Sequence, residues 1–165
     1  MNRVLIVTSQ SNDAKALSEV LQDASDGPYA IESLTLLAPA LARIDSGDID
    51  VILVDLSLPD SKGIATFDQL FAAAPQIPIL ILSGTEEEEL ANLAVQRGAQ
   101  GYLSKGYFES YLVPQSLRNI IQRKAVEESV FMEKVESLLI IILKRSNYES
   151  KTMQIFRKLV FPVAR

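Results

Sequence analysis

The sequence contains neither cysteine nor histidine. Because cysteine is absent, this sequence cannot form disulfides or use thiolate chemistry. Because histidine is absent as well, it lacks the usual ligands of zinc clusters. A Ser/His triad is excluded for the same reason. Without histidine no residue of this sequence can become a phosphohistidine. If the protein takes part in phosphoryl transfer from a phosphohistidine, the donor must be another molecule.

Basic residues are fewer than acidic residues. Lys and Arg number 16 against 21 Asp and Glu, which gives a formal net charge of -5. No block of basic residues stands out, whereas nucleic-acid binders usually carry a basic patch or stripe. We therefore expect no direct contact with nucleic acid.

Long apolar runs are missing as well. The run over residues 138–143 is far shorter than the roughly 17–25 residues that cross a membrane. The run over residues 4–7 directly follows the start of the chain and is too short for the core of a signal peptide. These features predict a cytoplasmic protein without a membrane segment.

Apolar runs alternate with amphipathic stretches along most of the chain. With 48% hydrophobic residues, the 165 residues suffice for one globular domain and an extension. The apolar runs predict strands over residues 4–7, 29–34, 51–54, 79–82 and 101–104. Residues 1–125 therefore predict an α/β, flavodoxin-like fold, a doubly wound five-stranded parallel sheet of strand order 2-1-3-4-5. Residues 126–165 are expected to form a C-terminal helical extension or tail.

Three chemically distinct side chains follow three of these predicted strands. Asp55 follows the third strand, Ser83 the fourth and Lys105 the fifth. Open parallel sheets form their ligand sites at the carboxyl ends of the strands. A carboxylate nucleophile, a hydroxyl and a cation in one such site can accept a phosphoryl group.

The motifs around these side chains resemble those of the receiver domains of two-component response regulators. In that family the phosphoacceptor aspartate is followed by proline four residues on and by glycine eight residues on. The fourth strand ends in serine or threonine before a small residue, and the fifth ends in lysine with an aromatic residue three positions earlier. The matching residues here are Asp55, Pro59, Gly63, Ser83, Gly84, Tyr102 and Lys105.

The resemblance implies a role for each of the chemically important positions. Asp55 would accept the phosphoryl group, and Lys105 would neutralise one of its oxygens. Ser83 would donate a hydrogen bond to it, and the missing side chain at Gly84 would leave space for it. Tyr102 would be the switch residue that turns inward or outward with the phosphorylation state.

One position departs from the family pattern. The family has a pair of acidic residues after the first strand that hold Mg²⁺, and this chain has Thr8 and Ser9 there. Asp55 and the carbonyl of Ser57 remain as ligands, so we expect Mg²⁺ binding to be weak or absent. Asp13 is the nearest other acid, and we interpret it as a residue favoured by the dipole of a helix N-terminus. Phosphorylation would then be impaired.

Four consecutive glutamates occupy residues 86–89. Acidic side chains are favoured in the first turn of a helix because they face its positive end. We interpret this run as a solvated first turn and assign it no catalytic role.

The tail after residue 125 has apolar residues at alternating steps of three and four, with Glu128 at one skipped position. They are Ile121, Ala125, Met132, Val135, Leu139 and Ile142. This spacing permits an extended helix that pairs with a second copy of the chain. The alternative is an amphipathic helix folded back on the domain. Residues 159–163 are either a small docking segment or a disordered end.

Three functions remain compatible with the sequence. The first is a non-enzymatic phosphorelay receiver that takes its phosphoryl group from a sensor histidine kinase or phosphotransfer protein and acts on a downstream output protein. The second is a pseudo-receiver that binds protein partners without phosphorylation, through the face formed by its fourth and fifth helices and fifth strand. The third, a nucleotide or flavin binder, is least favoured because no glycine-rich loop follows the first strand.

Overall fold

The computed structural model describes residues 1–25 and 28–145. Its main feature is a five-stranded sheet in which every neighbouring pair of strands is parallel, in the order β2-β1-β3-β6-β7. The strands are β1 (Asn2–Val7), β2 (Tyr29–Leu34), β3 (Val51–Asp55), β6 (Ile79–Ser83) and β7 (Gly101–Ser104). Numbered along the chain these are strands 2-1-3-4-5, so the predicted flavodoxin-like sheet is confirmed.

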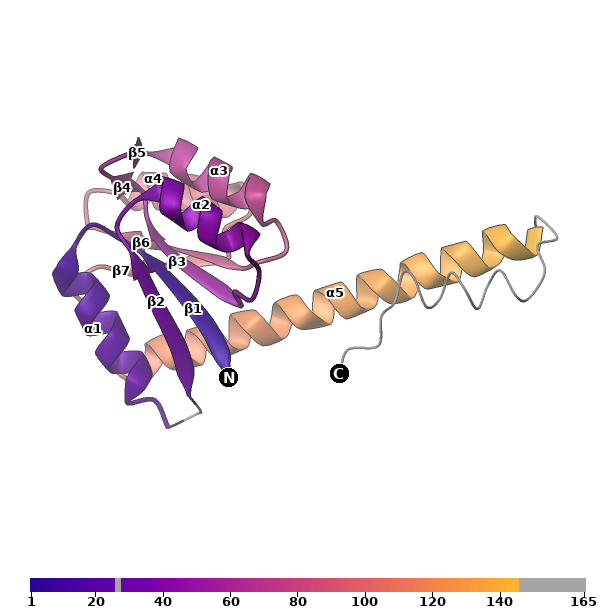
Figure 1. Ribbon diagram of the computed structural model, residues 1–165, viewed down its shortest axis with the longest axis horizontal. Coiled ribbons are helices and arrows are strands. Elements are labelled where there is room, and N and C mark those ends of the chain that lie inside the picture. Colours follow the sequence, from indigo (N-terminus) through magenta and orange to yellow (C-terminus); the bar gives the residue numbers. More distant parts are fainter. Residues whose placement is uncertain (26–27, 146–165) are drawn as a thin grey trace. The chain divides into compact units, whose positions relative to one another are not determined.

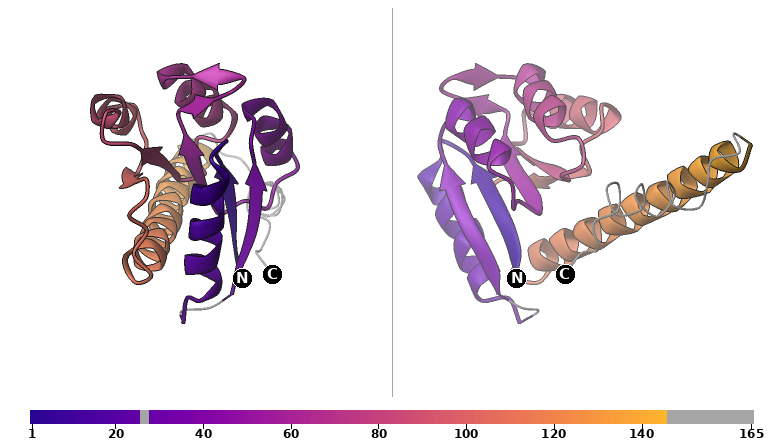
Figure 2. Two further views of the ribbon diagram at one scale, coloured as in Figure 1. Left: turned by 90° about the vertical axis from the view of Figure 1, so that its left-hand side faces the viewer. Right: turned by 45° about the vertical axis from the view of Figure 1, so that its right-hand side comes forward.

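Helices cover both faces of this sheet (Figure 1 and Figure 2). α1 (Ser11–Gln22) and the beginning of α5 (Leu112–Arg145) pack on one face. α2 (Leu37–Asp45), α3 (Ile64–Ala73) and α4 (Glu88–Gln96) pack on the other. All residues of β3 and β6 are buried, which explains why their sequences are apolar without alternation.

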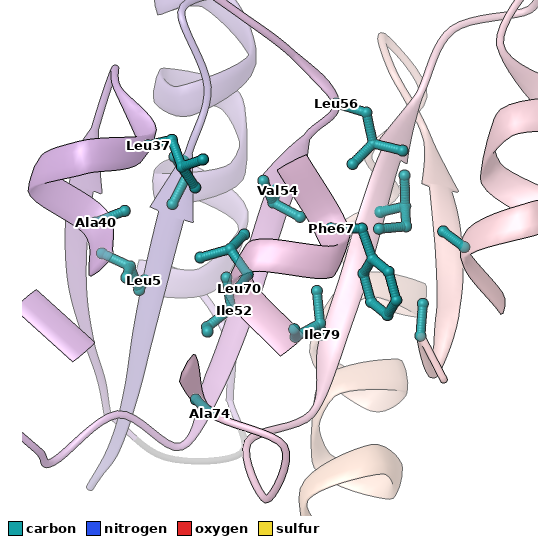
Figure 3. Close-up of a cluster of buried hydrophobic side chains, with 14 of the residues drawn as sticks. Leu5, Leu37, Ala40, Ile52, Val54, Leu56, Phe67, Leu70, Ala74 and Ile79 are labelled. Atoms are coloured by element: carbon teal, nitrogen blue, oxygen red, sulfur yellow. The ribbon is translucent and has the colours of Figure 1, made fainter. Parts of the chain in front are cut away.

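Two hydrophobic clusters fill the space between the sheet and its helices. Figure 3 shows the larger cluster, in which Val54 of β3 and Phe67 and Leu70 of α3 are buried together. The ring of Phe67 stacks on that of Phe71 with centroids 5.4 Å apart. Burying the strands from both sides holds their carboxyl ends in fixed positions, and the functional site is built on those ends.

One local feature differs from the sequence-based expectation. A two-stranded antiparallel hairpin, β4 (Ser57–Leu58) and β5 (Ser61–Lys62), follows β3 and was not predicted. α5 begins at Leu112 and contains Pro114 in its first turn. Proline fits within this first turn because the backbone nitrogens there have no partner inside the helix.

The chain divides into two compact units, Met1–Lys124 and Ala125–Arg165, and α5 continues from the first into the second. In the second unit residues 125–145 are helical, which agrees with the helical extension expected from the sequence. The segment 159–163 lies outside the described residues. Within residues 1–25 and 28–145, no helix combines the length and the apolar character required to cross a bilayer.

Candidate functional site

The candidate site lies where three adjacent strands end. The register pairs Asp55 of β3 with Leu82 of β6, and Ser83 of β6 with Ser104 of β7. The backbone N–H of Lys105, the residue after β7, donates to the carbonyl oxygen of Ser83 at 2.9 Å. This register brings Asp55, Ser83 and Lys105 to one edge of the sheet, as the sequence predicted.

The Asp55 carboxylate is almost fully enclosed, with 1% of its side chain exposed. Lys105 Nζ lies 2.9 Å from Asp55 Oδ2, and the Thr8 hydroxyl donates to the same oxygen at 3.4 Å. The backbone N–H of Ser57 donates to Asp55 Oδ1 at 2.8 Å. A buried carboxylate is costly unless it is paired, and here each oxygen has a donor and a cation is adjacent.

Thr8 and Ser9 occupy the loop after β1, at the positions where the resemblance implies an acidic pair. Thr8 is buried, its N–H donates to the carbonyl of Leu34, and its hydroxyl accepts from the N–H of Gln10 at 3.1 Å. Ser9 is half-buried. The neutral Thr8 hydroxyl therefore borders the Asp55 carboxylate on this side, and Ser9 adds no charge to the loop.

These residues are a poor set of ligands for a tightly held Mg²⁺. Magnesium prefers carboxylate, phosphate and water oxygens in an octahedral arrangement. The part of the chain that the structure describes contains no group of three or more Asp, Glu, His or Cys that could hold a metal ion. Asp55 Oδ2 already faces Lys105, so the oxygens that would receive the ion are partly engaged.

Ser83 is buried at the end of β6. Its hydroxyl donates to the carbonyl oxygen of Gly84 at 3.1 Å. In this arrangement the hydroxyl is hydrogen-bonded within its own loop. It would have to rotate about its side-chain torsion before it could donate to a group attached to Asp55.

Glu87 is a member of the site that the sequence analysis missed. Its Oε2 lies 3.1 Å from Lys105 Nζ and accepts from the backbone N–H of Gly84 at 2.8 Å. A methyl group built on Gly84 would meet this same oxygen at 3.3 Å. The space that the sequence analysis left free beside Gly84 is thus filled by the Glu87 carboxylate.

Local sequence patterns do not single out Glu87. α4 begins at Glu88, so Glu87 is the residue that precedes the helix. The Ser/Thr-x-x-Glu spacing of a capping box is carried by Thr85 and Glu88. That pattern would therefore have pointed to Glu88 and not to the glutamate that contacts Lys105.

The charges of Lys105 and Glu87 stabilise each other. Burial acts to lower the pKa of Lys105, but hydrogen bonds and charge from Asp55 and Glu87 outweigh it and raise that pKa above its ordinary value. Burial acts to raise the pKa of Glu87, but the Gly84 N–H and Lys105 outweigh it and lower that pKa. Both groups are therefore charged at neutral pH.

The loop that begins at Asp55 is held at two further points. Gly63, which has a φ of +69°, donates its N–H to the carbonyl of Leu56 at 2.7 Å. The Asp60 carboxylate accepts from the N–H groups of Leu37 and Ala38, at 2.8 and 3.0 Å, where α2 begins. The Ala38 bond and then the Leu37 bond lower the pKa of Asp60.

Two other predicted residues lie at the surface. Pro59 is exposed in the turn between β4 and β5. Tyr102 lies in β7 with 40% of its surface exposed, and the nearby Tyr107 and Tyr111 are more exposed still. The Tyr102 side chain is therefore exposed to solvent.

A family model for the response regulator receiver domain matches residues 4–117. The chain belongs to the response regulator receiver domain family. The match begins within β1 and covers the other four strands of the sheet and all the candidate site residues named above. The resemblance inferred from the motifs is thereby confirmed.

Curated response regulators share this receiver region. The nitrate/nitrite response regulator protein NarL of Escherichia coli is 32% identical over 125 residues, covering 76% of this chain and 51% of its own length. The cell cycle transcriptional regulator CtrA of Caulobacter vibrioides is 29% identical over 128 residues, covering 78% and 54%. The chain thus spans about half the length of these relatives.

Solved structures show the same fold. A receiver domain protein from Clostridium thermocellum has a TM-score of 0.68 at 20% identity, covering 76% of this chain and 98% of that one. NtrX from Brucella abortus has a TM-score of 0.69 at 21% identity, covering 79% and 29%. The family, the fold and the relatives together assign this receiver domain to two-component signalling.

Proposed function

We propose that this protein is a phosphorelay receiver that accepts a phosphoryl group on Asp55 with impaired binding of Mg²⁺. The observation that carries the proposal is the placement of Lys105 Nζ 2.9 Å from Asp55 Oδ2 at a buried strand end. A carboxylate held beside a fixed cation has both parts needed to receive a phosphoryl group and to neutralise it.

The transfer itself is a displacement at phosphorus. One carboxylate oxygen of Asp55 attacks the phosphorus of a phosphohistidine, the bond from phosphorus to the imidazole nitrogen breaks, and that nitrogen keeps the electron pair. Lys105 offsets the negative charge on the phosphoryl oxygens during the transfer. The Ser83 hydroxyl, after rotating away from Gly84, would donate to one of them.

Weak metal binding follows from the neutral side chains of Thr8 and Ser9. When bound, Mg²⁺ would neutralise phosphoryl charge, with Asp55 and the carbonyl of Ser57 as its protein ligands. Without an acidic pair this contribution is small, so the reaction is expected to be slow. Slow phosphorylation, not its absence, is the outcome we favour.

The implied partners are a sensor histidine kinase or phosphotransfer protein as donor and a downstream output protein as receiver of the signal. The proposed role is that of a signalling protein of the cytoplasm and not of an enzyme with its own substrate. The net charge of -5 supports protein partners over direct contact with nucleic acid.

A second candidate function is a pseudo-receiver that binds its partner without phosphorylation. It is favoured by the neutral Thr8 and Ser9 and by the exposed tyrosines at positions 102, 107 and 111. Tyrosines supply large contact area at low entropic cost, which suits a protein interface. The face formed by α4, β7 and the start of α5 would then bind the partner directly.

Pairing of two copies through the C-terminal helix also remains part of the proposal. The heptad-like spacing lies in a helical segment, and Met132 and Ile142 on this stripe are exposed. Size-exclusion chromatography with light scattering, on the full chain and on a Met132→Glu variant, would test it. A monomer mass for both would remove this part of the proposal.

The deciding experiment is intact-mass spectrometry after incubation with acetyl phosphate and Mg²⁺, beside an Asp55→Asn control and an active receiver domain in parallel. A phosphoryl adduct on the native chain that the control lacks would support the receiver function. No adduct, with the parallel receiver modified, would leave the phosphate-independent interaction module.

A further inference from the structure

The candidate site contains an anion of its own. The Glu87 carboxylate uses two donors, Lys105 Nζ at 3.1 Å and the N–H of Gly84 at 2.8 Å. A cation and a backbone N–H that converge on one oxygen form the kind of cradle that binds an oxyanion. Here the occupant is a side chain of the same protein.

The position of that occupant overlaps the site proposed for the phosphoryl group. The carboxylate fills the space beside Gly84, because a methyl group there would meet Glu87 Oε2 at 3.3 Å. Lys105 Nζ, which Glu87 contacts, is also the cation 2.9 Å from Asp55 Oδ2. A phosphoryl group on Asp55 would therefore need the donors that Glu87 now holds.

We propose that the Glu87 carboxylate is an internal competitor that occupies the oxyanion-binding donors beside Asp55 and must leave them when a phosphoryl group arrives. This inference deepens the proposed function and, for its role in signalling, rests on it. The competition for the donors itself is a property of Lys105, Gly84 and Glu87 that exists whether or not Asp55 is phosphorylated.

Charge and exposure both favour displacement over coexistence. A phosphoryl group brings roughly -1.5 to -2 charges, and a carboxylate that shares its donors is repelled by it. The Glu87 side chain is 33% exposed, so it can swing into water without losing a buried position. The Ser83 hydroxyl is bonded to Gly84 O, so it does not hold the carboxylate in place.

Displacement would also change the start of α4. Glu87 is the residue before this helix, and its side chain ties the helix start to Gly84 and to Lys105 after β7. Release of both bonds frees the loop 84–87 from the end of β7. The competitor thus connects arrival of an oxyanion to the α4–β7 face.

The test is a titration of the full chain with inorganic phosphate, followed through the amide ¹H–¹⁵N signal of Gly84. It is run in the Asp55→Asn background, where phosphorylation cannot occur, with sodium chloride at matched ionic strength as the salt control. Glu87→Gln keeps an oxygen that can accept from Gly84 but removes the charge. Glu88→Gln, one residue on and exposed, is the matched control.

The expected result is that Glu87→Gln binds phosphate about tenfold more tightly than the parent, while Glu88→Gln is unchanged. Equal phosphate affinity in the parent and in Glu87→Gln would overturn the proposal. Glu87→Asp is the second variant, because its shorter side chain keeps the charge but cannot reach both donors. It should also bind phosphate more tightly than the parent.

A second arm separates this inference from the proposed function. The native chain and Glu87→Gln are incubated with acetyl phosphate and Mg²⁺, and the mass adduct is followed over time. Faster modification of Glu87→Gln supports both proposals. Tighter phosphate binding with no adduct on either protein would retain the competitor and reject the phosphorelay function, whereas an adduct with no difference in phosphate binding or rate would do the reverse.

Discussion

Lys105 Nζ bridges two carboxylates, lying 2.9 Å from Asp55 Oδ2 and 3.1 Å from Glu87 Oε2. Asp55 ends β3, Glu87 lies after β6 as the residue before α4, and Lys105 follows β7. Lys105 therefore links both sides of the site, and its substitution should affect both carboxylates.

Replacing Lys105 by methionine should destabilise the fold by about 1–3 kcal/mol, because Asp55 would remain buried with only neutral donors. Urea denaturation measures the change, and Lys62→Met, at an exposed lysine of β5, is the control. The double variant Asp55→Asn, Lys105→Met should recover part of the loss, since it removes the unpaired charge. Additive effects of the two single changes would contradict the coupling.

The pH dependence of the site follows from the two shifted groups. The pKa of Glu87 is lowered from 4.5, so its contribution to stability is complete above 4.5 and is lost as pH falls through the lower folded value. The pKa of Lys105 is raised from 10.5, so its contribution is complete below 10.5 and is lost as pH rises through the higher folded value.

Carbon-13 NMR of the Glu87 carboxyl carbon in the full chain would measure the first of these shifts. The midpoint should lie below 4.5 in the native protein and move upward in Lys105→Met, which removes the cation. A midpoint that does not move in this variant would show that Lys105 does not hold the Glu87 carboxylate in solution.

Restoring acids after β1 should restore metal binding. The double variant Thr8→Asp, Ser9→Asp adds two carboxylates to the loop after β1, and Mg²⁺ affinity should rise at least about tenfold. Isothermal titration calorimetry measures it, with Thr8→Asn, Ser9→Asn as a neutral control. The proposal of weak metal binding would be wrong if the native chain bound Mg²⁺ as tightly as the acidic variant.

Gly98, which ends the turn after α4, should not tolerate a side chain. Its φ is +123°, and a Cβ atom there would meet the Phe71 ring at 2.9 Å. Gly98→Ala should therefore cost about 2–4 kcal/mol through backbone strain and overpacking. Gly47→Ala has a positive φ but nothing within 4 Å, and about 1 kcal/mol is expected there. Equal losses in thermal or urea unfolding would contradict the packing contribution.

The sequence predicted the sheet well because its central strands are buried on both faces. β3 and β6 have to be apolar throughout, so their runs are visible without any knowledge of their neighbours. The parallel order then brings Asp55, Ser83 and Lys105 to one edge. For these residues the position along the strand was enough to predict the place in space.

The contacts of Glu87 and Thr8 could not be predicted with the same ease. Four glutamates in a row have the same chemistry, and which one faces Lys105 depends on α4 beginning at Glu88. The bond from the Thr8 hydroxyl to Asp55 joins residues 47 positions apart and depends on one side-chain rotamer. Such contacts are set by tertiary packing, which local sequence patterns do not predict.

The two sides of the site differ in how they are anchored. The segment after Asp55 is fastened through Ser57, through Gly63 and through the Asp60 carboxylate at the start of α2. The segment after Ser83 is fastened mainly by one glutamate, whose carboxylate an incoming anion can replace. One side of the site is therefore held by several fixed contacts and the other mainly by Glu87. An arriving anion should move the loop 84–87 and leave the loop after Asp55 in place. When phosphate is added, amide hydrogen exchange should accordingly become faster in residues 84–90 and stay unchanged in residues 56–63.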